Sequence, residues 1–275
     1  MLLALVFIYL FITIGIGLLA AKRVHNSADF AIAGRHLPLA MIVTTTFATW
    51  FGSETVLGIP AKFVNGGLQG VVEDPFGAGF CLIFVGLFFA GKLYQMTLLT
   101  ISDYYRERYG RAVEVICSLI IMLSYLGWVS AQVTALGLVF NLLSGGAVSV
   151  PLGMTIGVVS ILAYTLFGGM WSVALTDVVQ TAAIVIGLII VAVLMGQKAG
   201  GFDVVIAKAH AAGKLDLFPH VKTAAWLTFI GEFITMSLGS IPQQDVFQRV
   251  TSAKDERTAL IGTAGGGLFY FFFAF

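Results

Sequence analysis

The chain has 275 residues, of which 59% are hydrophobic and only 11% are charged. A soluble globular domain carries about 25% charged residues, so this composition excludes a soluble enzyme and predicts a surface that mostly faces lipid. The formal net charge of +1 excludes a nucleic-acid partner, which would need a basic face. Cys81 and Cys117 both lie inside apolar stretches and form no disulfide framework or metal-ligand spacing.

Several apolar runs have the length that a membrane-spanning helix needs, which is about 20 residues. They cover residues 2–21, 37–59, 76–94, 113–143, 150–168, 172–196 and 223–247. A further run begins near Ala259 and is still apolar at Phe275. We therefore expect a polytopic membrane protein that continues beyond Phe275. The first run lacks the basic start and cleavage site of a signal peptide and counts as a span.

Lys and Arg residues are distributed unequally over the connecting segments. One set of loops holds ten of them, namely Lys22, Arg23, Arg35, Lys92, Arg106, Arg108, Arg111, Arg249, Lys254 and Arg257. The opposite set holds five, namely Lys62, Lys198, Lys208, Lys214 and Lys222. The positive-inside rule predicts a multi-pass protein of the plasma membrane with its N-terminus outside. Residues 197–222 are predicted to lie outside and to form a short amphipathic helix at the interface.

The run 37–59 carries polar residues that a lipid-facing helix should reject. The segment 44–55 contains six hydroxyl side chains and Glu54. Gly52 and Pro60 weaken the helix, so carbonyls near residues 48–56 are expected to be free, and free carbonyls at bilayer depth suit a small cation. The alternative is a proline-kinked packing helix whose hydroxyls bond to their own backbone.

Glu73-Asp74-Pro75 stands where an outer loop enters the run 76–94. It is either an acidic N-terminal turn with proline at the first helical position, or an acidic lip that attracts a cationic solute.

Ser124, Trp128 and Gln132 recur every four residues in the run 113–143, so they share one helix face. This face either provides polar contacts between helices or lines a solute cavity, in which the Trp128 ring offers its π face to a cation.

Two apolar runs meet at Gly168-Gly169, which predicts a turn between two helices. The second helix presents Thr176, Asp177 and Gln180 on one face. Asp177 is interpreted either as a cap near the interface or as part of an ion path.

Gln243, Gln244 and Asp245 lie between a proline break at Pro242 and a basic segment. The spacing predicts that Asp245 pairs with Arg249 along one helix.

The segments 48–58, 164–180 and 247–254 resemble the sodium:solute symporter family. Members of that family have about thirteen spans, built around two inverted five-helix repeats. The resemblance implies an all-α, polytopic membrane helix bundle with a five-plus-five inverted-repeat fold, truncated after the first repeat and the start of the second. In this sequence, span 1 would be 2–21, the first repeat 37–196, the outer interfacial helix 197–222 and the start of the second repeat 223–275.

The resemblance also implies a sodium site that uses the backbone carbonyls of Ala48 and Phe51 as metal ligands, with further ligands beyond this sequence. It places Asp177 on the route of sodium toward the cytoplasm, and Thr176 and Gln180 belong to the same path.

Trp50 and Trp128 are similar to tryptophans that enclose a quaternary ammonium in the choline-transporting branch, although neither Ala78 nor Gln243 is aromatic as in that branch. The predicted substrate cavity consists of Trp50, Glu54, Thr55, Asp74, Trp128, Gln132 and Gln243.

These observations predict a sodium-coupled symporter in the lipid bilayer that imports a small polar organic solute by alternating access, with a quaternary amine as one candidate. The alternative is a membrane sensor domain of the same fold, coupled to a cytoplasmic signalling module. No catalytic residues are expected, because the histidines lie in loops and form no cluster with Cys or carboxylates.

Overall fold

The computed structural model describes residues 2–220 and 223–274, and in these ranges every regular element is helical. The α-helices are α1 (Leu2–Ala21), α2 (Ser27–Ile32), α3 (Leu39–Trp50), α4 (Ile59–Gly66), α5 (Ala78–Phe84), α6 (Ala90–Gln95), α7 (Ile101–Tyr109), α8 (Arg111–Leu143), α9 (Val150–Lys198), α10 (Phe202–Ala211), α11 (Thr223–Ser237), α12 (Gln244–Ser252) and α13 (Glu256–Phe273). Short 3-10 or π segments are η1 (Ala33–Arg35), η2 (Glu54–Gly58), η3 (Gln69–Val71), η4 (Val72–Gly77) and η5 (Val85–Phe89).

The predicted class, an all-α membrane helix bundle, is confirmed. Helical stretches long and apolar enough to cross a bilayer are Leu3–Ala21, Gln69–Gln95, Arg111–Leu143 and Val150–Lys198. The runs 37–59 and 223–247 are helical but broken. The first divides into α3 and η2, which continues into α4, and the second divides into α11 and α12. The predicted outer amphipathic helix corresponds to α10, and residues 221 and 222 at the end of that connection lie outside the described residues.

The predicted turn at Gly168-Gly169 is confirmed inside α9. Gly169 has φ +47° and ψ −136°, a conformation that L side chains rarely adopt, and the chain changes direction there. A Cβ on Gly169 would lie 2.2 Å from the carbonyl oxygen of Phe30, so this glycine also allows α2 to approach the break.

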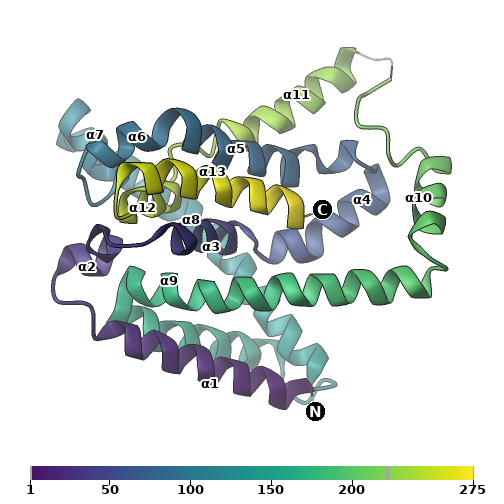
Figure 1. Cartoon of the computed structure of the whole chain (residues 1–275), viewed down its shortest axis with the longest axis horizontal. Coiled ribbons are helices and arrows are strands. Elements are labelled where there is room, and N and C mark those ends of the chain that lie inside the picture. The colour runs from purple at the N-terminus through teal and green to yellow at the C-terminus, as the bar shows by residue number, and fades with distance from the viewer. Residues whose placement is uncertain (1, 221–222, 275) are drawn as a thin grey trace.

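The loops with many basic residues gather at one end of the bundle. Figure 1 shows α2, α7 and α12 at its left-hand end, and α4 and α10 at its right-hand end. Leu37 N–H donates to Ser252 O at 3.0 Å, and Lys254 N–H donates to Leu37 O at 3.0 Å. At the opposite end, Leu68 N–H donates to Lys214 O at 2.8 Å. The two loop sets predicted from Lys and Arg, apart from Lys222, which the structure does not describe, therefore lie at opposite ends.

Helix α13 packs closely against α3 because α13 presents glycines to α3 at the crossing. A Cβ on Gly262 would lie 2.5 Å from Ile42 Cγ2, and a Cβ on Gly266 would lie 2.7 Å from Thr46 Cβ. Small residues allow helix backbones to approach in membranes, where packing rather than water exclusion drives association. The contact holds the broken α3 against α13 in the core.

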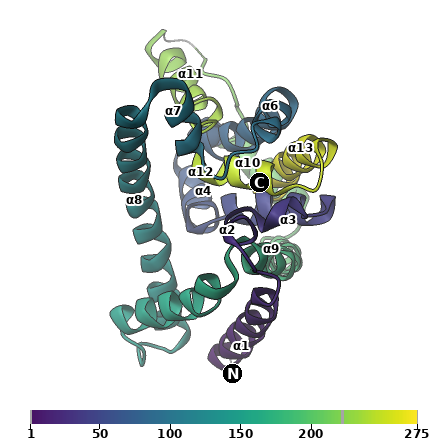
Figure 2. The ribbon, with the colours of Figure 1, turned by 90° about the vertical axis from the view of Figure 1, so that its left-hand side faces the viewer.

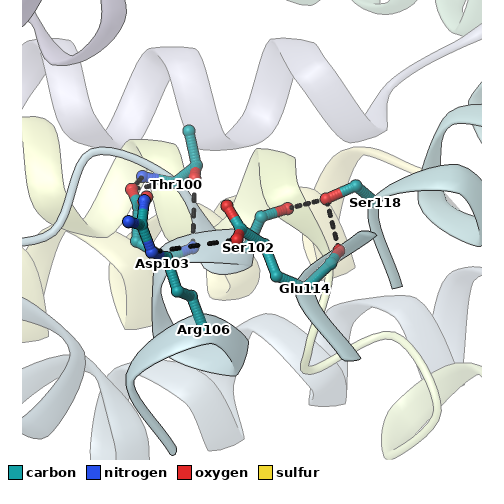
Figure 3. Close-up of polar contacts among 6 residues, drawn as sticks. All are labelled: Thr100, Ser102, Asp103, Arg106, Glu114 and Ser118. Carbon is teal, nitrogen blue, oxygen red and sulfur yellow. Dashed lines mark hydrogen bonds and ion pairs between the residues drawn. The ribbon is translucent and has the colours of Figure 1, made fainter. Parts of the chain in front are cut away.

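The corner between α7 and α8 is fixed by polar contacts (Figure 3). Thr100 and Asp103 form a reciprocal capping box at the start of α7. Ser118 Oγ donates to Ser102 Oγ at 2.9 Å, which ties α8 to α7. Figure 2 shows α8 running from this corner along one side of the molecule, so the corner sets the direction of the helix that carries Trp128.

Candidate functional site

The break between α3 and α4 lies at Phe51 to Ser53. Phe51 has φ −83° and ψ 75°, which takes its carbonyl out of the helical pattern. Gly52 N–H donates to Trp50 O at 3.1 Å, two residues back, so the carbonyl of Ala48 is released from its usual helical donor. The predicted break is confirmed. Pro60 lies after this break, in a helical segment that runs from η2 into α4, and its expected effect on the carbonyls before it stays a prediction.

A second break separates α11 from α12, and one hydrogen bond joins it to the first. Trp50, the last residue of α3, donates through its indole Nε1 to Asp245 Oδ2 at 2.9 Å. Tyr125 of α8 donates its hydroxyl to Asp245 Oδ1, and its hydroxyl oxygen accepts the Asp245 backbone N–H at 3.0 Å. The carboxylate of Asp245 thus connects α3, α8 and α12.

The predicted ion pair between Asp245 and Arg249 is wrong. Arg249 Nη1 donates to Gln248 Oε1 at 3.2 Å and to the backbone oxygen of Asp245 at 3.4 Å, and it does not bond the Asp245 carboxylate. The Asp245 carboxylate instead accepts from Trp50 and Tyr125, because the break before α12 turns it toward α3 and α8.

Glu54 forms a second polar contact between the first break and α8. Trp128 Nε1 donates to Glu54 Oε1 at 2.9 Å, and Gln132 Nε2 donates to Glu54 Oε2. Gln132 Oε1 also accepts the backbone N–H of Ser53 at 2.9 Å. Trp128 and Gln132, two of the three residues of the polar face predicted on α8, therefore contact the broken segment at a carboxylate.

We call Trp50, Glu54, Tyr125, Trp128 and Asp245 the aromatic–carboxylate cluster. The rings of Tyr125 and Trp128 are perpendicular, with centroids 6.3 Å apart. Trp128 is 40% exposed. Within the described ranges neither carboxylate forms an ion pair with Lys or Arg. Carboxylates within a membrane are usually paired with a cation, and the faces of aromatic rings attract cations.

Thr55 and Asp74 belong to a different group. Tyr270 of α13 donates its hydroxyl to Asp74 Oδ1, and the same hydroxyl lies 3.0 Å from Thr55 Oγ1. Asp74 is only 8% exposed, whereas the neighbouring Glu73 forms an ion pair with Lys62 at 3.0 Å. The acidic turn thus divides into a surface ion pair and a buried carboxylate bonded to α13. Gln243, the remaining predicted cavity residue, precedes α12 and lies close in sequence to Asp245.

Asp177 lies between α3 and α9 and is 6% exposed. Thr45 of α3 donates its hydroxyl to Asp177 Oδ2, and Thr181 Oγ1 donates to Thr44 O at 3.3 Å. These hydrogen bonds join α9 to α3, and the role of Asp177 in an ion path stays a prediction. Thr176 differs, since its hydroxyl donates to the carbonyls of its own helix. Gln180 is half-buried, one turn beyond Asp177.

Sequence reasoning missed Thr45, Tyr125 and Tyr270 and gave Asp245 the wrong partner. Tyr125 lies three residues before Trp128 and so shares its helix face, a spacing that could have identified it. Tyr270 stands among phenylalanines, and nothing around it in the sequence marks a polar role.

Comparison with known proteins gives one consistent family. The profile described as the Sodium:solute symporter family matches residues 30–273. The high affinity choline transporter 1 of Homo sapiens is 28% identical over 94% of this chain and 46% of its own length. The high-affinity proline transporter PutP of Bacillus subtilis (strain 168) is 28% identical over 89% of this chain and 53% of its own length. The chain spans about half the length of the curated relatives that it matches.

A solved structure has the same fold. It is described as the substrate-bound outward-open state of a Na+-coupled sialic acid symporter, and it aligns with a TM-score of 0.81 at 22% identity. The alignment covers 98% of this chain and 58% of that structure. Similarity at this level of identity concerns the fold.

Proposed function

Because this chain belongs to the sodium:solute symporter family, we propose that the protein containing it imports a small organic cation together with sodium across the plasma membrane by alternating access. The observation that carries the proposal is the aromatic–carboxylate cluster, which lies where the breaks before α4 and before α12 meet. Broken helices at bilayer depth are where transporters of this kind bind solutes and ions.

The sodium part of the proposal rests on the first break and on Asp177. The carbonyl of Ala48 loses its usual helical donor, the carbonyl of Phe51 leaves the helical pattern, and the two supply oxygen ligands. Asp177 accepts a hydrogen bond from Thr45 of α3, the helix that ends at the break. A sodium ion that leaves the break therefore passes along α3 toward the Asp177 carboxylate. In this view sodium is co-transported cargo.

The charge of the solute follows from the cluster. Glu54 and Asp245 add two carboxylates to the surroundings of Trp50 and Trp128, and no Lys or Arg of the described chain pairs with either. A cationic solute would balance this charge, whereas an anionic solute would add to it. Choline transporters among the relatives also point to a cation.

The proposed arrangement in the membrane follows the sequence boundaries. Residues 37–196 form the first repeat and 223–275 begin the second, with 2–21 as a preceding span and 197–222 at the outer interface. The N-terminus and α10 are placed outside, and α2, α7 and α12 inside. The sensor alternative has no observation in its favour, since the relatives named above are all transporters.

Uptake measurements test the proposal. Cells that express the natural protein are given labelled choline, ethanolamine, proline, a sugar and a carboxylate, with sodium or with potassium as the main cation. We expect sodium-dependent accumulation of a cationic solute only. The proposal would be contradicted if accumulation were the same in potassium as in sodium, or if only anionic or neutral solutes accumulated.

A further inference from the structure

The hydrogen-bonding capacity of Asp245 is only half used. A carboxylate offers about four acceptor positions on its two oxygens. Tyr125 occupies one position on Oδ1, and Trp50 occupies one on Oδ2. One position on each oxygen remains, and the indole and phenol that hold the carboxylate fix the directions in which these positions point.

Glu54 is held in the same way. Trp128 occupies one position on Oε1, and Gln132 occupies one on Oε2. Ser53 Oγ is at 3.5 Å from Oε2, which is too long for a strong bond. Glu54 therefore also has acceptor capacity left beside the Trp128 ring.

Among the described residues, no Lys or Arg forms an ion pair with either carboxylate. The guanidinium of Arg249 reaches the backbone oxygen of Asp245 and the side chain of Gln248, and does not bond the Asp245 carboxylate. The donors that do reach Asp245 and Glu54 are neutral indole, phenol and amide groups. Within the part of the chain that the structure describes, neither carboxylate is bonded to a positively charged donor.

We infer that the transported cation carries N–H donors, as a primary or secondary ammonium or a guanidinium does, and that Asp245 and Glu54 select it over a quaternary ammonium. This inference rests on the proposed function of the aromatic–carboxylate cluster. A charge-assisted N–H bond to a carboxylate is shorter and about twice as strong as a neutral one. A quaternary ammonium has no N–H and gains only the attraction of charge and ring faces.

A methylation series isolates this property. Ethanolamine, its N-methyl and N,N-dimethyl derivatives and choline share one skeleton and one positive charge, and they lose one N–H donor at each step. Their binding to the purified natural protein in sodium is measured by competition with labelled ethanolamine and, separately, with labelled choline. We expect at least a tenfold loss of affinity from ethanolamine to choline.

Variants show whether the two carboxylates cause the preference. Asp245→Asn and Glu54→Gln should each bring the affinities of ethanolamine and choline to within about threefold of each other, because the amide no longer attracts an ammonium. Asp245→Glu keeps the charge and should keep the order of the series even if folding is weakened. Asp203→Asn, at an exposed carboxylate of α10, is the matched control and should leave the series unchanged.

The outcomes separate this inference from the function on which it rests. Equal or tighter binding of choline, or a preference that survives in Asp245→Asn and Glu54→Gln, would overturn the inference and leave cation symport standing. Sodium-dependent binding of an anionic or neutral solute, with none of the four amines bound, would overturn both.

Discussion

Trp50 and Asp245 are 195 positions apart in the sequence, and the indole Nε1 of Trp50 lies 2.9 Å from Asp245 Oδ2. Trp50 ends α3 and Asp245 stands in the first turn of α12, so the bond joins the two helix breaks. A relative movement of α3 and α12 has to break it. Under the proposed alternating access, the bond would stabilise one of the two exchanged states, by about 1.5 to 3 kcal/mol for a bond to a charged group.

Trp50→Phe is expected to keep the ring and lose the donor. Asp245 would then keep Tyr125 as its side-chain donor. We expect the KM of sodium-dependent uptake to rise about fivefold to tenfold, which corresponds to about 1 kcal/mol. Trp226→Phe, on α11 and stacked against Phe218, is the control and should leave KM unchanged. An unchanged KM in Trp50→Phe would show that the bond has no part in solute binding.

Asp177→Asn is expected to weaken the response of uptake to sodium. The charge of Asp177 would attract sodium beside α3, so the sodium concentration for half-maximal uptake should rise by about fivefold or more. Thr45→Val, which removes the hydroxyl that donates to Asp177, should change the same quantity by a smaller factor. Thr155→Val is the matched control, because its hydroxyl donates to the carbonyl of Pro151 in the same helix and belongs to no proposed site. An unaltered sodium response in Asp177→Asn would make this carboxylate purely structural.

Gly169→Ala is expected to reduce the amount of folded protein. The added Cβ meets the Phe30 carbonyl oxygen at 2.2 Å, and φ is +47°, so the cost is about 1 to 3 kcal/mol or more. Gly187→Ala in the same helix meets nothing within 4 Å and should be neutral or stabilising. The melting temperature in detergent measures both. Equal melting temperatures would mean that the chain does not need this break.

Cysteine labelling tests the orientation. Cys81 and Cys117 are first replaced by alanine, and single cysteines are introduced as Arg108→Cys in α7 and Lys208→Cys in α10. We expect a membrane-impermeant maleimide to label position 208 in intact cells, and position 108 only after permeabilisation. The reversed pattern would invert the proposed topology, and labelling of both from one side would contradict the placement of these helices at opposite ends.

The sequence by itself determined the helical membrane class, the breaks and the distribution of the loops. Each of these depends on local properties: run length and apolarity predict spans, Gly169 permits a turn, and Gly52 weakens the helix where α3 ends. The separation of Lys and Arg between two sets of loops also survives in the structure, because charged residues remain at the ends of helices that cross lipid.

Only the tertiary structure decided which polar groups meet. The sequence grouped Thr55 and Asp74 with Trp50, but the structure bonds them to Tyr270 of α13, and it assigns Asp245 to Trp50 and Tyr125 instead of Arg249. Spacing along one helix predicts contacts within that helix, whereas these contacts depend on how α3, α8, α12 and α13 cross. The crossings are set by side-chain packing at points such as Gly262 and Gly266, and no single run of residues encodes them.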